Sequence, residues 1–173
     1  MNIKEQLDQI AIILNKEQIP FALIGGLAVG ALGYQRFTND IDLIVDGSSR
    51  SDVKRVFLAN GYSVFSENQE FLQLYGEASP VDIMFANREV SKNMLKSAQP
   101  ITGTESIKCL SAEAIIGLKI QSYATNPKRS LKERADIQAL IERHSINWDE
   151  VKDYADAFDK WNDIIEIRKL AEK

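Results

Sequence analysis

Two aspartates mark a stretch that is typical of a buried strand (41–45, IDLIV): Asp42 lies in it and Asp40 directly precedes it. Strand side chains point alternately to the two faces of a sheet, so both carboxylates share one face while Ile41 and Leu43 point into the core. Two carboxylates on a rigid strand suit hard divalent cations that also bind phosphate. An Asp-x-Asp pair can equally be a solvated strand edge or a turn cap, so its surroundings decide its meaning.

A glycine pair precedes the aspartates. Residues 21–24 favour a strand, Gly25 and Gly26 follow at once, and residues 27–32 favour a short helix. Glycine lets the backbone turn sharply and approach a ligand closely. The unpaired N–H groups and the positive dipole end of a helix start attract anions. The order of these features predicts that Gly25 and Gly26 bind phosphate.

A third carboxylate, Asp82, lies in the otherwise apolar strand 81–85 (VDIMF). A carboxylate in such a strand is costly unless it is paired or bound to a metal. It could also be an edge residue or an acceptor for a backbone N–H group. Because Asp40 and Asp42 precede it, we favour a third ligand of one metal site.

The composition excludes several other kinds of site. The 173 residues carry a net charge of −4 and the pI is about 5.1, so the whole chain is no electrostatic binder of nucleic acid. One cysteine (Cys109) and one histidine (His144) exclude a disulfide framework and leave little for a zinc site or a Cys–His pair. We expect Cys109 in the core or at a strand edge, and His144 at a helix end. Without a signal peptide in residues 1–19 or an apolar bilayer-spanning segment, we expect a cytoplasmic protein without a membrane partner.

The remaining pattern predicts a mixture of strands and helices. Hydrophobic periodicity and capping signals predict further helices over 2–18, 49–60, 91–97, 111–124, 130–144, from 147 onward and over 161–171, and further strands over 62–66, 70–75 and 106–110. The first capping box is expected at Ser49–Asp52, where the helix would bury Leu58, and the second at Ser130–Glu133. We expect a core over residues 1–110 and a C-terminal helical region over 111–173 that packs on it.

Five basic residues gather between residues 119 and 134. Lys119 projects close to the apolar face of its helix, where it either extends its amine to water or contacts phosphate. Asp136 either pairs with Lys132 or positions Lys119. The group as a whole is either a solvated helix face or a polyphosphate contact.

These motifs together resemble the nucleotidyltransferase superfamily, which shares its catalytic core with DNA polymerase β. The resemblance rests on Gly25-Gly26, on Asp40-x-Asp42 and on Asp82 in a neighbouring strand. The sequence GGLAVGALGYQRFTNDIDLIV is similar to minimal nucleotidyltransferases and to AbiEii-type toxins of type IV toxin–antitoxin systems. Lys119 and the run 132–137 (KERADI) resemble the helical part of those toxins.

The resemblance implies an α+β nucleotidyltransferase fold, a small mixed β-sheet flanked by helices with a C-terminal helical part. It implies an enzyme that moves a nucleoside monophosphate from an NTP such as ATP to an acceptor hydroxyl, with Mg²⁺ (or Mn²⁺) as cofactor. The implied catalytic and metal-binding residues are Asp40, Asp42 and Asp82. The implied nucleotide-binding residues are Gly25, Gly26, Arg36, Thr38 and Lys119.

The resemblance leaves the acceptor open among RNA (a tRNA included), a protein and a small molecule. It suggests a toxin–antitoxin partner protein or an antibiotic-resistance setting. The alternative is a non-catalytic member of the same fold that binds a nucleotide or a partner. The presence of all three aspartates argues for the enzyme.

Overall fold

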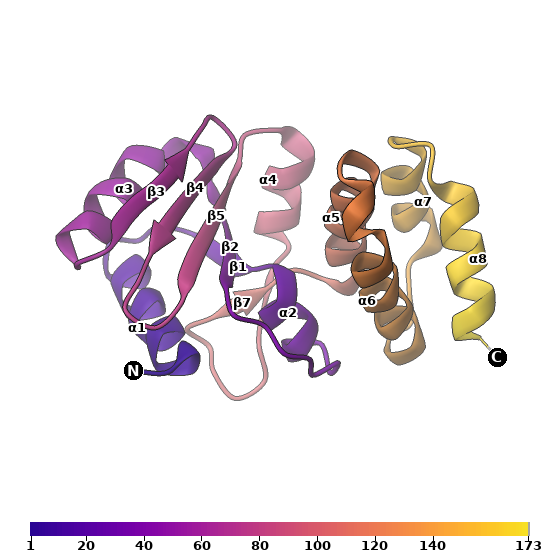
Figure 1. Ribbon diagram of the computed structural model, residues 1–173, viewed down its shortest axis with the longest axis horizontal. Helices are drawn as coiled ribbons and strands as arrows, with labels where there is room; N and C mark the ends of the chain where they lie inside the picture. Colours follow the sequence, from indigo (N-terminus) through magenta and orange to yellow (C-terminus); the bar gives the residue numbers. More distant parts are fainter. Residues whose placement is uncertain (173) are drawn as a thin grey trace. The chain divides into compact units, whose positions relative to one another are not determined.

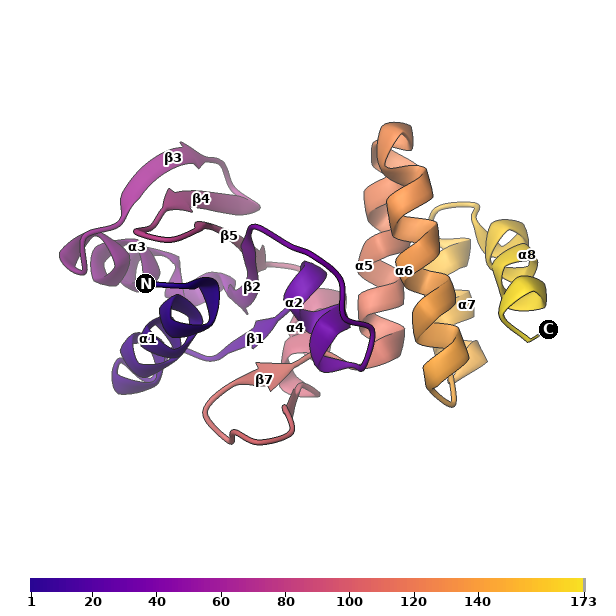
Figure 2. The same cartoon turned by 60° about the horizontal axis from the view of Figure 1, so that its bottom comes forward.

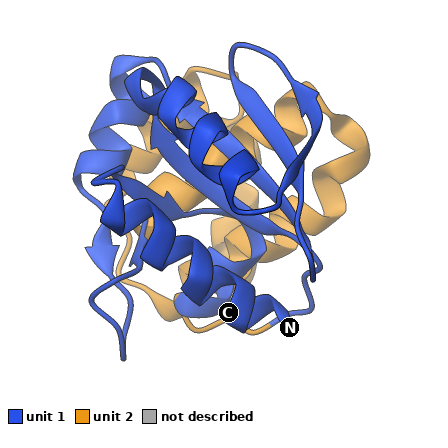
Figure 3. Cartoon of the chain, turned by 90° about the vertical axis from the view of Figure 1, so that its left-hand side faces the viewer, with its two compact units in different colours: residues 1–31, 36–110 blue, residues 32–35, 111–173 orange. Residues whose placement is uncertain are grey.

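The chain folds into two compact units, which Figure 3 colours separately. The structure is a computed structural model that describes residues 1–172. Unit 1 comprises residues 1–31 and 36–110, and unit 2 comprises residues 32–35 together with the chain from Ser111 onward. The chain therefore enters unit 2 briefly at residue 32 before it returns to unit 1 at residue 36. The division into domains at residue 110 stays a prediction.

Unit 1 is built on a mixed sheet whose strand order is β3-β4-β5-β2-β1-β7-β6 (Figure 1). Within the described residues the strands are β1 (Phe21–Leu23), β2 (Ile41–Asp46), β3 (Ser63–Glu67), β4 (Phe71–Tyr75), β5 (Pro80–Ala86), β6 (Gln99–Pro100) and β7 (Lys108–Cys109). β2 pairs in parallel with β5 and antiparallel with β1, while β3, β4 and β5 form an antiparallel meander. The predicted mixed sheet is confirmed.

Helices and apolar strand faces make the core of unit 1. The helices are α1 (Ile3–Lys16), α2 (Gly25–Ala31), α3 (Arg50–Ala59) and α4 (Glu89–Lys96), with the 3-10 turn η1 (Gly47–Ser49) before α3. α1 begins with a capping box between Asn2 and Glu5, and it buries Ile10 and Leu14 completely. In Figure 2, α1 and α3 lie on the same side of the meander. Ile41, Leu43 and Val45 of β2 are fully buried, as their alternation predicts.

Unit 2 is helical. Its helices are α5 (Ala112–Thr125), α6 (Ser130–Arg143), α7 (Trp148–Asp156) and α8 (Trp161–Ala171), with η2 (Pro127–Arg129) between α5 and α6. Ser111 and Asn147 cap α5 and α7 through their side chains, next to the predicted helix starts at residues 111 and 147. None of the helices in residues 1–172 combines the length and apolar character that crossing a bilayer requires. A cytoplasmic location stays a prediction.

Two predicted capping boxes are wrong. α3 and α6 each follow a 3-10 turn, and within the described residues neither Ser49 nor Ser130 caps a helix through its side chain. At the first of these ends, Asp46 instead accepts the backbone N–H of Ser48. Leu58, expected in the core, is 46% exposed, because the buried stripe of α3 runs through Val53, Val56 and Phe57.

Candidate active site

Three carboxylates converge in unit 1. Asp42 of β2 and Asp82 of β5 are directly paired across the parallel strands, and Asp40 lies two residues before Asp42 on the approach to β2. One carboxylate oxygen from each residue lies within 4.8 Å of the others, and all three residues are half-buried. Paired positions on neighbouring strands put side chains on the same face, so the sheet itself sets this geometry. Three converging carboxylate oxygens are a donor set that could hold a divalent cation.

Neutral donors orient two of these carboxylates. The hydroxyl of Thr38 donates to Asp40 Oδ1 at 2.6 Å, and Nε2 of Gln73 donates to Asp82 Oδ1 at 3.1 Å. Gln73 lies on β4, directly opposite Asp82. Outer partners of this kind fix the direction of a ligand oxygen and tune its affinity for metal. Thr38 was predicted to bind nucleotide, and the structure gives it a contact to a candidate metal ligand. Gln73 was missed.

The two glycines make room for the aspartate and its loop. Gly25 has a φ of +63°, and a Cβ atom there would lie 1.9 Å from Asp42 Oδ2. A Cβ atom on Gly26 would lie 2.6 Å from the hydroxyl oxygen of Thr38. Any larger residue at either position would displace the side chains that build the site. The phosphate contacts predicted for Gly25 and Gly26 stay predictions.

The loop from residue 36 to residue 40 lies against the two glycines that begin α2. Arg36 Nη1 donates to the carbonyl oxygen of Phe37 at 3.1 Å, and its Nη2 atom lies 3.1 Å from the position of a Cβ on Gly26. The ring of Phe37 is 85% exposed. Arg36 therefore lies against the first turn of α2, while Thr38 and Asp40 lie further along the same loop.

The stem of this loop, Leu32–Gln35, belongs to unit 2. Nε2 of His144 lies 2.7 Å from the carbonyl oxygen of Leu32, and the guanidinium of Arg143 lies over the ring of Tyr34 at 5.1 Å. His144 follows α6 as its C-cap, so the predicted helix-end position is confirmed. Its contact with Leu32 spans 112 positions of the chain, and no local pattern could have indicated it.

Lys119 lies in α5 of unit 2 and is buried. Its Nζ donates to Glu133 Oε2 at 2.8 Å and to Asp136 Oδ2 at 2.6 Å. Ser122 and Arg129 donate to the other oxygen of Glu133. Burial disfavours the ionised form of Glu133, but the charges of Lys119 and Arg129 outweigh this cost and lower the pKa of its carboxyl. The nucleotide contact predicted for Lys119 stays a prediction.

The predicted basic group is largely neutralised by ion pairs. Arg129 pairs with Glu133, and Arg134 lies within 3.6 Å of Asp163 and 3.5 Å of Glu166. Lys119 is held by its two carboxylates.

The lone thiol of Cys109 is buried, as expected, and burial raises its pKa to about 12, so it is a poor nucleophile.

Comparison with known proteins gives a likeness in structure. Neither a protein-family model nor a curated protein matches the sequence. Among solved structures, the antibiotic-resistance factor ANT(2'')-Ia superposes with a TM-score of 0.71 at 19% identity, over 96% of this chain and 97% of that one.

Two further solved structures extend this likeness. The lincosamide antibiotic adenylyltransferase LnuA, bound to lincomycin, superposes with a TM-score of 0.60 at 19% identity, over 80% of this chain and 96% of that one. An antigenic nucleotidyltransferase-like protein from Paracoccidioides brasiliensis gives a TM-score of 0.59 at 19% identity, over 96% of this chain and 91% of that one. The chain therefore has the nucleotidyltransferase fold, and the predicted fold class is confirmed.

Proposed function

We propose that this protein is a nucleotidyltransferase that moves a nucleoside monophosphate from an NTP to an acceptor hydroxyl and depends on Mg²⁺ or Mn²⁺. The observation that supports the proposal is the convergence of Asp40, Asp42 and Asp82, each of which offers a carboxylate oxygen within 4.8 Å of the others. The cluster occurs in a fold that this chain shares with two proteins named as a nucleotidyltransferase-like protein and an adenylyltransferase.

The three aspartates would hold the cation. Their oxygens form a compact, half-buried set on paired strands, which suits a hard cation better than thiol or imidazole ligands would. When bound, a divalent cation neutralises charge on phosphate oxygens and makes the phosphorus more electrophilic. Thr38 and Gln73 keep two of the carboxylates in the binding orientation.

The transfer itself is a displacement at the α-phosphorus. The acceptor oxygen forms a bond to this phosphorus, the bond to the oxygen that bridges to the β-phosphate breaks, and pyrophosphate leaves. Asp82 accepts the proton of the acceptor hydroxyl as general base. Gly25 and Gly26 let the triphosphate approach the backbone, and Arg36 beside them contributes a guanidinium that matches phosphate geometry.

A pyrophosphate-release assay with each NTP, in Mg²⁺ or Mn²⁺, tests the proposal. We expect turnover in the wild type and its loss in Asp42→Asn. Asp46→Asn is the matched control, because Asp46 ends the same strand but lies outside the carboxylate cluster. Turnover in Asp42→Asn at the wild-type rate would refute the mechanism.

The same assay addresses the alternative function. Tight NTP binding without release of pyrophosphate from the NTP, whichever acceptor is supplied, would identify a non-catalytic binding protein. The setting, a toxin–antitoxin pair or antibiotic resistance, is to be resolved by the acceptor that supports turnover and by a protein that co-purifies with the chain.

A further inference from the structure

The sheet face that carries the carboxylates continues across the meander. Asp42, Asp82 and Gln73 are paired in register on β2, β5 and β4, and Ser66 of β3 is paired with Gln73. Directly paired residues share a face, and neighbouring strands lie about 4.8 Å apart. These four residues therefore form one polar row that leads outward from the candidate metal site. We call it the polar row.

Exposed aromatic side chains lie on both sides of the polar row. Along β4, Phe71 and Tyr75 lie two residues before and after Gln73, about 7 Å away on the same face. Phe71 is 44% exposed and Tyr75 is 51% exposed. Phe65, at the irregularity of β3, is 63% exposed and its ring centroid lies 5.1 Å from that of Tyr75. Exposed apolar groups that gather on one face mark binding sites more often than scattered ones do.

A buried glutamine holds one end of the meander. Gln6 of α1 is fully buried. Its amide nitrogen donates to the carbonyl oxygen of Ser79, and its side-chain oxygen accepts the backbone N–H groups of Ala78 and Ser79 at 2.9 and 2.8 Å. The turn between β4 and β5 is thereby fixed to the helix beneath it.

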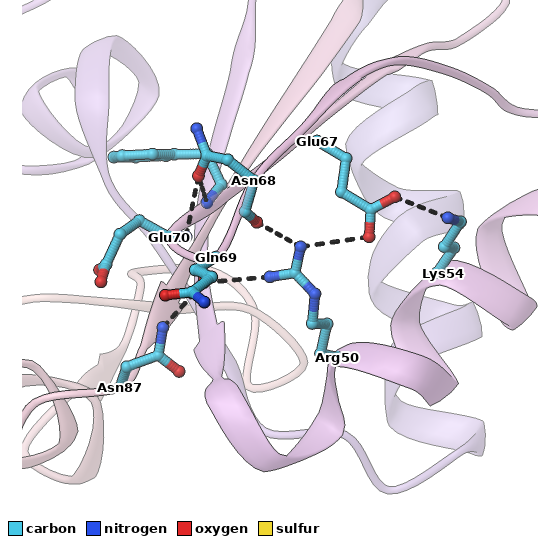
Figure 4. Close-up of polar contacts among 8 residues, drawn as sticks. Arg50, Lys54, Glu67, Asn68, Gln69, Glu70 and Asn87 are labelled. Atoms are coloured by element: carbon cyan, nitrogen blue, oxygen red, sulfur yellow. Dashed lines mark hydrogen bonds and ion pairs between the residues drawn. The ribbon is translucent and has the colours of Figure 1, made fainter.

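A polar cluster holds the other end, as Figure 4 shows. Arg50 of α3 donates to Glu67 and to the carbonyl oxygens of Asn68 and Gln69, which lie in the turn between β3 and β4. Lys54 pairs with Glu67 at 2.6 Å, and Asn87 after β5 donates to the carbonyl oxygen of Gln69 at 2.9 Å. With both turns fixed, the aromatic side chains stand on a rigid support, which lowers the entropy cost of binding a ligand.

The charge on this face limits what can bind. The described strands β3, β4 and β5 turn nine residues to it, and none is basic: Ser63, Phe65, Ser66, Phe71, Gln73, Tyr75, Pro80, Asp82 and Met84. Arg50 and Lys54 at the end of the meander are already engaged by Glu67. Affinity for a nucleic-acid strand comes mainly from cations that contact phosphates. The face therefore suits an uncharged or cationic ligand.

We infer that the polar row and its flanking aromatic side chains bind the acceptor, and that this acceptor is a polyhydroxylated ring compound without negative charge. The inference rests on the proposed function, since it assigns the acceptor of that reaction. Ring faces stack on Phe71 and Tyr75, hydroxyl groups bond to Gln73 and Ser66, and one hydroxyl reaches Asp82. Gln73 links the two tasks, because it contacts the ligand and orients the carboxylate that takes the proton.

Backbone amide NMR titration with three probes tests this inference without relying on turnover. The probes are the trisaccharide of glucosamine (cationic), the trisaccharide of N-acetylglucosamine (uncharged) and the trinucleotide of adenylate (anionic). We expect both trisaccharides to shift amide signals of β4 and the trinucleotide to leave them unchanged. Phe71→Ala and Tyr75→Ala should each weaken trisaccharide binding about tenfold. Ile12→Ala, an exposed apolar residue of α1, is the matched control and should have no effect.

A substitution that adds a positive charge sharpens the test. Ser66→Arg places a cation on the polar row, so it should weaken binding of the cationic trisaccharide and allow the trinucleotide to bind. Binding of the trinucleotide to wild-type β4, unaltered trisaccharide binding in both aromatic variants, or no trisaccharide binding at millimolar concentration would each overturn the inference. Because Asp42→Asn removes turnover but leaves the aromatic side chains, loss of activity there bears on the proposed function alone.

Discussion

The two units each gather carboxylates, but they do so in opposite ways. In unit 1, Asp40, Asp42 and Asp82 are half-buried, and neutral donors orient two of them. In unit 2, Glu133 and Asp136 are almost fully buried and enclose the ammonium of Lys119. The second cluster encloses an ammonium group of the same unit, and the first is a donor set that could hold a divalent cation. Similar residue types thus build a buried ion-pair network in one unit and a candidate metal site in the other.

The difference follows from where the residues lie. α5 and α6 pack along their length, so a lysine on one helix reaches carboxylates on the other away from water. Such a buried network costs much desolvation energy, and it is stable only while every member remains. Asp42 and Asp82 instead lie near the start of two parallel strands and are only half-buried. The comparison predicts that substitutions in unit 2 change stability and that substitutions in unit 1 change binding and turnover.

The largest expected effect is on stability. Lys119→Met should lower the free energy of unfolding by about 3–5 kcal/mol, because it leaves two buried carboxylates without their shared ammonium. Chemical denaturation measures this change. Manganese affinity and NTP affinity, measured on the folded variant, separate the roles of Lys119. An unchanged NTP affinity would contradict the predicted nucleotide contact, and an unchanged stability would contradict the comparison.

Removing a sheet carboxylate should affect turnover and metal binding more than stability. Asp42→Asn should reduce turnover by more than about a hundredfold, beyond the loss typical of an outer partner of a metal ligand. We expect a smaller change of its unfolding free energy than for Lys119→Met, because Asp42 is half-buried while Lys119 is almost fully buried. The wild type should gain thermal stability on addition of Mn²⁺, and the variant should gain less. Equal Mn²⁺ stabilisation of both proteins would argue that the carboxylates are not the metal site.

Two neutral outer partners should have intermediate effects. Thr38→Val and Gln73→Leu each remove one hydrogen bond to a candidate ligand, and we expect each to weaken metal affinity by about 10–100-fold. Isothermal titration with Mn²⁺ measures the loss. Thr38→Ser and Gln73→Glu are the paired tests, because serine keeps the donor while glutamate replaces it with a fourth carboxylate. Affinities of Thr38→Ser and Thr38→Val that are equally low would assign Thr38 a packing role.

Acid should act on unit 2 through Glu133. The pKa of this carboxyl is lowered in the folded state, so its contribution to stability is complete above the ordinary value of 4.5 and is lost as pH falls below it. Glu133→Gln should flatten the decline of stability below pH 4.5. Denaturation series at several pH values, monitored by helical circular dichroism, would show the change. A decline of identical steepness in both proteins would place the acid sensitivity elsewhere.

The smallest effect concerns the stem of the site loop. His144→Ala removes the contact to the carbonyl oxygen of Leu32, which is worth about 1 kcal/mol, whereas His144→Gln can restore a donor. Hydrogen exchange of the amides at 36–40 should accelerate in the alanine variant and recover in the glutamine variant. Trp148→Leu disrupts another cation–π contact of unit 2, with Arg168, and serves as the control. Faster exchange of the loop in that control would indicate general loosening.

The parts of the site that local sequence patterns encode could be predicted. Strand alternation placed Asp40, Asp42 and Asp82 on strand faces, and parallel pairing of β2 with β5 then brought them together. Gln73 was missed because its role depends on the register of β4 against β5, which a hairpin pattern alone does not define. The partners of Lys119 lie one helix away, so Asp136 was left between two roles.

The helix starts show a second limit. The Ser-x-x-Asp and Ser-x-x-Glu patterns suggested capping boxes at Ser49 and Ser130, but a 3-10 turn precedes each helix and already continues the backbone. In α6, Glu133 accepts a hydrogen bond from Lys119 of α5 and does not cap its own helix. Local propensity cannot indicate this tertiary contact. The contact between His144 and Leu32 likewise depends on long-range packing.

Because residues 32–35 belong to unit 2, the two units cannot be exchanged by a single recombination event. The peptide chain crosses between the units three times, before residue 32, after residue 35 and before residue 111. A recombination event with a single junction near residue 110 would join a new helical module to a stem evolved for His144 and Arg143. Exchange of the helical module between relatives therefore requires that residues 32–35 and the chain from residue 111 onward be replaced together. Substitutions in residues 32–35 are expected to co-vary with the end of α6 more closely than with their own neighbours in sequence.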